Sequence, residues 1–586
     1  YKVCRDGGQL LCQAPTGIGK SMSVLFPALK SMGNESVGPI FYLTARGTTR
    51  TAAENALAIL RNTEPELHLR SVTLTAKDKI CLCETRECTP EACPYANGYY
   101  ARIKGALWDV LDVPCLTAET LQEYAERHMV CPFELGLDSS LWSDVIIGDY
   151  NYLFDPVVHL VRFFESAGDY IFLVDEAHNL PGRAREMHSA ALTKTSFYEA
   201  KKLLGKGKSS LKNALTKVND VFIEWRHRAE EETAARDGRF GKTFFLKERS
   251  EEFDHLLNRL CEPLEAWLDD HREPDETHTA LLQLYFDVRA WLRVADTFDD
   301  HFVLQITASG SEVRAAQLCL DPSAFLADSF ALGRAAVLFS ATLAPASYYK
   351  DLCGVPEARA VALRSPFPAG NQGLFCIGNV STRYKDRDAS LAIVAESLAT
   401  MVRARCGNYL AFFPSYAYME QAYAQFKEHC PEINCIKQEN AMDEQQKAAF
   451  LAQFVPGPSQ TLLGFAVMGG VFGEGVDLTG DRLIGVGIVG PGLPQVGPRQ
   501  EQLRDYFEQT RGSGFDYAYR YPGMNKVLQA AGRVIRTPRD KGVVLLIDSR
   551  FAMPDYRRLM PPHWSHLKMI YDTEKLEREL GRFWEE

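Results

Sequence analysis

The stretch QLLCQAPTGIGKS, residues 9–21, decides the fold of this 586-residue chain. Its first five residues form a short apolar run, and the next eight contain two glycines. An apolar-periodic segment, MSVLFPALKSM at 22–32, follows. Strand, glycine-containing turn and helix, in that order, are the context of a phosphate-binding loop, whose backbone N–H groups and helix N-terminus hold phosphates. The stretch therefore predicts a nucleotide-binding α/β domain.

The residue types in this loop have separate tasks. Lys20 is placed to reach the β- and γ-phosphates, and the Ser21 hydroxyl is placed to bind Mg²⁺. The first position of the loop is usually glycine and is alanine here, so the loop is a variant of the general pattern. The residues predicted to contact nucleotide are Ala14, Pro15, Thr16, Gly17, Ile18, Gly19, Lys20 and Ser21.

A second motif, DYIFLVDEAHNL at 169–180, supports the same chemistry. An apolar strand ends there in two carboxylates, and ligands of open α/β sheets bind beyond the carboxyl ends of strands. Asp175 is therefore expected to hold Mg²⁺ through water, and Glu176 to polarise the attacking water. The alternative is a simple helix N-cap, which Lys20 and Ser21 in the same chain disfavour.

Later apolar runs predict a second α/β unit with its own motifs, GGVFGEGVDL at 469–478 and QAAGRVIR at 529–536. Gln529, Arg533 and Arg536 have the spacing i, i+4, i+7, so on a helix they would share one face. Two such arginines fit arginine fingers that act on the γ-phosphate when two domains close. The alternative is a solvated basic helix face. Asp477 is expected to couple the site to domain closure.

Four of the fifteen cysteines lie within thirteen positions of the segment ICLCETRECTPEACPYANGYY, residues 80–100. Thirty-seven residues separate Cys93 from Cys131. The spacing allows either zinc or an iron–sulfur cluster, and the lack of a C-x2-C pair weakens a zinc ribbon. The remaining cysteines are mostly isolated, which indicates a reducing compartment.

The motifs APTGIGKS, DEAH, SAT (340–342), GEGVDL and QAAGRVIR, in this chain order, resemble those of superfamily 2 helicases. The cysteine segment between the first two is similar to that of the XPD/DinG-like iron–sulfur helicases. The resemblance implies ATP and Mg²⁺ as cofactors and movement 5′→3′ along DNA. It also implies a 4Fe–4S cluster with the ligands Cys81, Cys88, Cys93 and Cys131. Cys83 and Cys115 are then extra thiols outside the ligand set. Cys83 is the clearer case, because the Cys81-x-Cys83 spacing is too tight for both thiols to reach one cluster.

The predicted fold class is α/β, with two RecA-like parallel-sheet motor domains, an inserted Fe–S cluster domain and a helical arch-like insertion. Apolar residues at helical spacing between 253 and 292 predict the last of these. The first motor is expected to be truncated at its N-terminus, because the chain does not begin with Met. The expected boundaries are motor 1 at 1–75, 137–181 and 313–345, the cluster domain at 76–136, the insertion at 182–312 and motor 2 at 346–586.

Composition limits the function further. The 65 basic and 76 acidic residues give a net charge of −11, which excludes a uniformly basic nucleic-acid coat but allows a local basic groove. No run of about eighteen apolar residues appears, so no membrane span is expected. We expect an ATP-dependent DNA helicase in DNA repair or replication, acting as a cytoplasmic monomer on single-stranded and forked DNA. The alternatives are a DNA-dependent translocase that remodels complexes without unwinding, and an RNA helicase.

Overall fold

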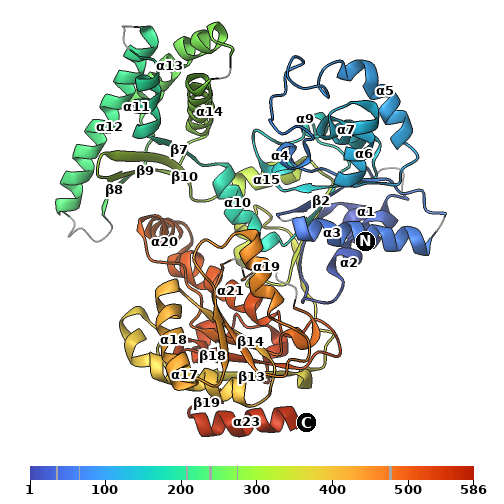
Figure 1. The fold of residues 1–586 in the computed structure, drawn as a ribbon, viewed down its shortest axis with the longest axis vertical. Coiled ribbons are helices and arrows are strands. Elements are labelled where there is room, and N and C mark those ends of the chain that lie inside the picture. Colours follow the sequence, from blue (N-terminus) through green and yellow to red (C-terminus); the bar gives the residue numbers. More distant parts are fainter. Residues whose placement is uncertain are drawn as a thin grey trace.

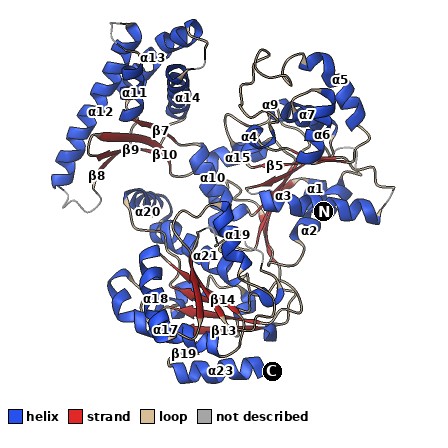
Figure 2. Ribbon diagram, in the orientation of Figure 1, coloured by secondary structure: helices blue, strands red, loops and turns tan. Residues whose placement is uncertain are grey.

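The computed structural model holds two parallel sheets and one antiparallel sheet in three parts of the molecule (Figures 1 and 2). The two parallel sheets confirm the expected pair of RecA-like motor domains. The structure describes residues 1–586 except 34–36, 46, 65, 206–208, 236–240, 274, 471, 474–477 and 586. Asp477, expected to couple the nucleotide site to closure, therefore lies outside the described residues.

The first sheet has eight parallel strands in the order β12-β1-β11-β6-β2-β5-β3-β4. Its central strands are short apolar runs buried on both faces, as expected for a parallel sheet covered by helices on both sides. The bounds are β1 (Gly8–Gln13), β2 (Ile40–Thr44), β3 (Ser71–Thr73), β4 (Cys115–Leu116), β5 (Val145–Asp149), β6 (Ile171–Asp175), β11 (Ala335–Ser340) and β12 (Arg359–Ala362).

The two faces of this sheet belong to different hydrophobic cores. Along β2, Ile40 and Tyr42 pack into one core and Phe41 and Leu43 into the other, because successive strand residues point to opposite faces. The first core holds α1 (Lys2–Asp6), α2 (Lys20–Ser31) and α3 (Gly47–Thr63). The second holds α4 (Lys77–Ile80), α5 (Tyr99–Val110), α6 (Ala118–His128), α7 (Pro132–Ser139), α8 (Asn151–Phe154), α9 (Val161–Phe164), α15 (Ser323–Ala331) and α16 (Ala346–Leu352).

The cysteine-bearing segment 76–136 is part of the first motor rather than a unit with a separate core. Its strand β4 pairs with β3 in the first sheet. Apolar side chains of α5, α6 and α7 share one core with Phe41 and Phe172 of the central strands. The first motor also continues past the expected boundary at 345, because β12 pairs with β1.

The insertion contains four long helices and an antiparallel sheet in the order β7-β10-β9-β8. The expected apolar stripes are buried in its own core, but the sheet was not predicted. The expected end at 312 is the first residue of β10, whose eight residues all pair with β9, so the insertion runs to 319. The bounds are β7 (Ala190–Thr193), α11 (Lys194–Leu203), α12 (Ser210–Ala235), β8 (Lys242–Leu246), α13 (Glu251–Asp270), α14 (Glu276–Asp296), β9 (Phe302–Ser309) and β10 (Glu312–Cys319).

The second motor has seven parallel strands in the order β15-β16-β14-β17-β18-β13-β19. The strands are β13 (Gln372–Ile377), β14 (Asn408–Phe413), β15 (Asn434–Lys437), β16 (Leu462–Val467), β17 (Gly485–Val489), β18 (Gly542–Ile547) and β19 (Lys568–Ile570). The helices are α17 (Arg387–Arg403), α18 (Tyr416–His429), α19 (Glu444–Ala452), α20 (Pro498–Arg511), α21 (Tyr521–Ala531), α22 (Pro554–Arg557) and α23 (Thr573–Glu585). Helix α10 (Leu180–Met187) joins β6 to the insertion. Among the described residues, no helix has the length and hydrophobicity needed to cross a bilayer.

Candidate functional site

The loop between β1 and α2 has the backbone of a phosphate-binding loop. Gly17 and Gly19 adopt positive φ values of 83° and 72°, which glycine alone adopts without strain. The backbone N–H of Ala14 donates to the carbonyl of Ser340 on β11, which ties the start of the loop to the sheet. A Cβ at residue 17 would lie 2.2 Å from the Arg536 carbonyl oxygen, so the second motor lies directly on this loop.

Glu176 accepts hydrogen bonds from both sides of the first motor's site. Lys20 Nζ lies 3.1 Å from its Oε1, and Ser340 Oγ donates to its Oε2 at 2.9 Å. Burial opposes ionisation of Glu176, but the charge of Lys20 and the hydrogen bonds from His178 and Ser340 outweigh it and hold the pKa of Glu176 well below its usual range. Glu176 is therefore ionised in this arrangement and accepts hydrogen bonds through both of its oxygens.

Tyr42 links the phosphate-binding loop to the neighbouring carboxyl, and the sequence prediction missed it. Its hydroxyl donates to Asp175 Oδ2 at 2.6 Å and lies 3.1 Å from Ser21 Oγ. Burial and the adjacent charge of Glu176 raise the pKa of Asp175 to about 6. The available signal was a hydroxyl-bearing side chain in the middle of a buried apolar strand. Tyr150 supports the same turn by donating to the Asp175 carbonyl.

His178 joins the two motors. Its Nδ1 lies 2.7 Å from Ser340 Oγ, and its Nε2 lies 2.6 Å from the side-chain nitrogen of Gln529 on α21. Because an amide nitrogen only donates, Nε2 must accept, which places the ring proton on Nδ1. The donors then run in one direction, from Gln529 through His178 and Ser340 to Glu176.

The two arginines after Gln529 do not share a helix face with it, so that prediction is wrong. Helix α21 ends at Ala531, and Arg533 and Arg536 lie in the turn that follows. The chain leaves the helix at Gly532 and brings the backbone of residue 536 onto the phosphate-binding loop. Arg533 is buried, with 6% of its surface exposed.

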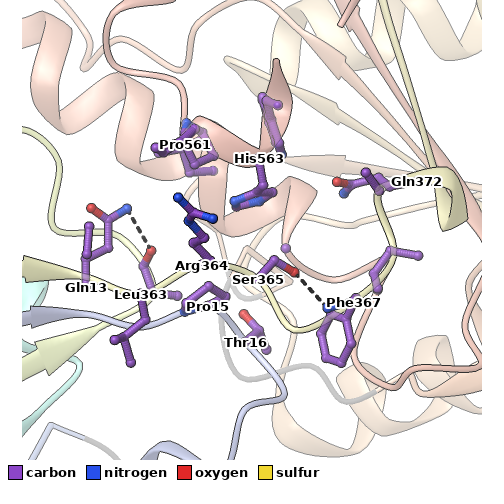
Figure 3. A pocket seen from close by; sticks show the side chains of 18 of the residues that line it. Gln13, Pro15, Thr16, Leu363, Arg364, Ser365, Phe367, Gln372, Pro561 and His563 are labelled. Carbon is purple, nitrogen blue, oxygen red and sulfur yellow. Dashed lines mark hydrogen bonds between the residues drawn. The ribbon is translucent and has the colours of Figure 1, made fainter. Parts of the chain in front are cut away.

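A cavity of about 620 Å³ adjoins this contact (Figure 3). Its volume lies in the range of small-molecule sites. Burial, together with the nearby His566, lowers the pKa of His563 on its wall. Its lining comes from both motors and the segment that joins them, and includes Pro15, Thr16, Arg364, Phe367, Gly532, His563 and Trp564.

The expected cluster ligands are only partly brought together. Cys83 Sγ lies 3.8 Å from Cys93 Sγ, and partial burial with the adjacent Cys93 and Cys81 raises the pKa of Cys83 to about 11. Cys88 is exposed, and Cys131 precedes the first turn of α7. Among the described residues, no three side chains of the metal-binding types are grouped to hold a metal ion.

The local backbone explains why these thiols are not assembled as expected. Residues 81–98, all described, contain no helix or strand that could fix the directions of the side chains. In small metal-binding segments the metal–ligand bonds themselves supply that order. Cys83, expected to be an extra thiol, lies beside the expected ligand Cys93. The donor chemistry of the segment still suits an iron–sulfur cluster.

Two family models match the chain at the positions that form the site. The model described as DEAD_2 matches residues 59–197, which include the cysteine-bearing segment and Glu176. The model of the helicase C-terminal domain matches residues 398–567, which include Gln529 and both arginines. The two matches thus fall on the two motors whose side chains meet at His178.

Relatives and solved structures agree with these models. The helicase subunit XPD of general transcription and DNA repair factor IIH from Schizosaccharomyces pombe is 24% identical over 540 residues, covering 76% of this chain and 67% of that protein. Together these findings support an XPD/DinG-like superfamily 2 helicase. The ATP-dependent DNA helicase CHL1 of Coccidioides immitis is 22% identical, and the match covers 77% of this chain and 60% of that protein.

Solved structures with the same fold cover almost the whole of this chain. The structure named XPD_Helicase has a TM-score of 0.63 at 18% identity, with 97% of each chain covered. The structure of S. tokodaii Xpd4 has a TM-score of 0.60 at 14% identity, also with 97% of each chain covered. The shared fold includes the two motors and the insertion.

Proposed function

We propose that this chain is an ATP-dependent DNA helicase that moves along single-stranded DNA and unwinds duplex DNA in repair or replication. One observation carries the proposal: a continuous set of side-chain contacts connects the two motors, from Lys20 through Glu176, Ser340 and His178 to Gln529. These contacts are proposed to transmit a change at the phosphate end of the site to the second motor. Such coupling is what stepwise movement along a strand requires.

In the first motor, the loop N–H groups and Lys20 bind the phosphates of ATP, and Ser21 and Asp175 hold Mg²⁺. When Lys20 turns to the phosphates, it leaves Oε1 of Glu176 free to accept a proton from water. Ser340 continues to orient the other carboxylate oxygen. Glu176 is thus proposed as the general base. Its fixed position supports this role, and the departure of Lys20 removes the charge that most strongly lowers its pKa.

From the second motor, Gln529, Arg533 and Arg536 are proposed to stabilise the charge that develops on the γ-phosphate. The contact of the Arg536 backbone with Gly17 supports this, because it brings the turn to the loop that holds the phosphates. Asp477 remains proposed as the residue that couples this site to domain closure.

For the cysteine segment we propose a 4Fe–4S cluster held by Cys81, Cys88, Cys93 and Cys131. Cys83 is the alternative fourth ligand, because its sulfur lies beside that of Cys93. When bound, the cluster supplies the bonds that fix the fold of this segment. The family resemblance further implies 5′→3′ movement. We also propose that the chain acts on single-stranded and forked DNA as a monomer in the cytoplasm.

Unwinding of labelled forks with either a 5′ or a 3′ single-stranded tail tests this proposal. We expect ATP-dependent strand separation with the 5′-tailed fork, and ATP hydrolysis stimulated by single-stranded DNA. Stimulated hydrolysis without strand separation on either fork would instead establish a remodelling translocase. Separation of RNA duplexes alone would establish an RNA helicase.

A further inference from the structure

The two motors meet at a second place, away from the nucleotide site, through three tyrosine rings. The ring centre of Tyr348, on α16 of the first motor, lies 5.1 Å from that of Tyr517 and 5.2 Å from that of Tyr521 in the second motor. Both pairs are edge-to-face, an arrangement that aromatic rings favour. Tyr348 and Tyr517 are buried in the core that also holds the central strands of the first motor. This tyrosine contact therefore joins the motors through a shared hydrophobic core.

Two hydrogen bonds between the motors hold the tyrosine contact closed. The Tyr517 hydroxyl donates to Asp351 Oδ2, and the side-chain nitrogen of Asn525 donates to the Tyr349 hydroxyl. Burial and the bond to Asp351 raise the pKa of Tyr517, so its hydroxyl keeps the proton that it donates. Tyr517 and Asn525 are both buried, so the loss of either bond leaves a buried donor unpaired. Opening the tyrosine contact is therefore unfavourable.

Helix α20, which precedes the tyrosine contact in the second motor, also packs against the first motor. Its residues Leu503 and Phe507 belong to the same shared core. The guanidinium of Arg185 on α10 lies 5.8 Å from the ring centre of Phe507. Arg511 Nη2, at the other end of α20, lies 3.8 Å from Oδ2 of the buried Asp321. Helix α20 is thus held against the first motor and the base of the insertion (Figure 1).

Helix α21 carries two contacts with the first motor that differ in kind. The π-helical turn Asp516–Arg520 joins it to the segment that follows α20, and such turns are rare and frequent at functional sites. In the first turn of α21, Tyr521 belongs to the tyrosine contact. About 12 Å further along the helix, Gln529 reaches His178 in the nucleotide site through a single polar pair. When the motors separate, this polar pair is expected to open before the aromatic rings part.

We propose that the tyrosine contact is the pivot of the motor cycle: it stays closed while the cleft at the nucleotide site opens and closes. Helix α20 then keeps its place against the first motor, and the rest of the second motor rotates about the turn at 516–520. A large apolar contact between domains restricts their relative motion in this way. Tyr348, Tyr517 and Asn525 are positioning residues, because they act on Gln529 through α21. The assignment rests on the proposed function, in which ATP drives the motion.

Distances between paired spin labels in the full chain test the pivot. The labels are introduced as genetically encoded amino acids, because exposed cysteines such as Cys88 would react with thiol-directed labels. One pair, at the exposed Lys30 and Arg539, spans the nucleotide cleft. The other pair, at the exposed Ser347 and Gln509, spans the tyrosine contact. Each distance is measured with Mg²⁺ alone, with ADP and with a non-hydrolysable analogue of ATP.

The distance between Lys30 and Arg539 should shift with the nucleotide, and the distance between Ser347 and Gln509 should stay the same. Equal shifts in both pairs would overturn the pivot and leave the proposed function standing. The absence of any shift in either pair would contradict the nucleotide-driven motion on which the proposed function depends, and the pivot with it.

Tyr517→Phe tests the hydrogen bond across the tyrosine contact. It keeps the ring and removes the donor to Asp351, so the distance across the contact should spread over a wider range and shift with the nucleotide. Tyr519→Phe is the matched control, because the Tyr519 hydroxyl donates to Glu501 of the same motor at 2.5 Å. It should match the wild type, and thermal melting checks that both variants fold. Identical distance distributions in the two variants would overturn the role of Tyr517 in the pivot.

Discussion

The ionisation of two adjacent carboxyls decides what the nucleotide site can do. Glu176 is held charged by Lys20, whereas Asp175, one residue earlier, has its pKa raised to about 6 by burial and by the charge of Glu176. The ordinary pKa of an aspartate is about 3.9, so Asp175 gains a proton at a pH where other carboxyls remain charged. The tasks proposed for them also differ: Glu176 accepts a proton from water once Lys20 has moved to the phosphates, and Asp175 holds Mg²⁺.

Removing the charge of Glu176 tests the first task. Glu176→Gln should lower ATP turnover by about 100-fold or more, because a positioned base contributes at least that much. Nucleotide affinity should be equal or higher, because Lys20 loses an ion pair that competes with the phosphates. Turnover and equilibrium binding of labelled nucleotide check this. Glu186→Gln, which removes an exposed carboxylate paired with Arg183, is the control. Turnover within about tenfold of wild type would refute the assignment of the base.

The pH dependence of turnover tests the second task. The proposed role of Asp175 in holding Mg²⁺ requires its ionised form, so kcat/KM for ATP should fall as the pH drops through about 6. The hydrogen bond from Tyr42 stabilises the ionised form, so Tyr42→Phe should raise the pKa and move the midpoint of this fall to higher pH. Tyr150→Phe is the control, because Tyr150 donates to the Asp175 carbonyl and not to its carboxylate. Equal midpoints in the two variants would show that the titrating group is not Asp175.

At the scale of the elements, the contact between the motors depends on the glycine that faces the second motor. A Cβ at residue 17 would lie 2.2 Å from the Arg536 carbonyl and 2.6 Å from the ring of Phe367. At Gly19, which has a similar positive φ, a Cβ would meet no described atom within 4 Å. The same substitution at the two positions therefore separates backbone strain from a clash between the motors.

Gly17→Ala should lower ATP turnover far more than Gly19→Ala, although both variants carry a strain of about 1–2 kcal/mol. The additional loss comes from motors that can no longer approach each other. Turnover, together with chemical crosslinking between cysteines introduced on the two motors, checks this. A control crosslink within the first motor should be unchanged. If Gly17→Ala crosslinks and turns over like Gly19→Ala, the contact with Arg536 does not limit the closed arrangement.

The sequence predicted those elements whose signals are local. The phosphate-binding loop, the strand before Glu176 and the apolar stripes of α13 and α14 follow from neighbouring residues, and the structure has them where expected. The sheet of the insertion was missed because its strands pair across more than a hundred residues, as β7 does with β10. The prediction of a helix through Arg533 was wrong. The chain leaves the helix at Gly532 and contacts the first motor, and a contact between domains leaves no signal in the local sequence pattern. Tyr42 was missed, and the SAT motif was found without the contacts of Ser340, because both residues join the site only through tertiary contacts.

At the scale of the whole molecule, the cysteine-bearing segment and the first motor share one hydrophobic core. The nucleotide-binding helix α2 packs on the opposite face of the same sheet, in a different core. Loss of order near Cys81 should therefore lower the stability of the first motor while leaving the nucleotide loop formed.

Metal analysis and two substitutions test this arrangement. The purified protein should carry about four irons per chain. Cys88→Ser should remove the iron and lower the melting temperature, by about 2–4 °C for each kcal/mol lost. It should abolish unwinding and retain nucleotide binding. Cys83→Ser is the matched control and should keep the iron. Loss of iron with Cys83→Ser alone would transfer the ligand role to Cys83, and stoichiometric zinc in place of iron would refute the cluster.

The contact of the Arg536 carbonyl with Gly17 has a consequence for the speed of nucleotide exchange. The two backbones are too close for a phosphate group to pass between them, so we expect ATP to enter and ADP to leave after the motors separate. Separation of domains takes microseconds to milliseconds, much slower than diffusion of a small molecule into an open site. The observed rate of ATP association should therefore reach a plateau as the ATP concentration rises, and that plateau measures how often the motors open.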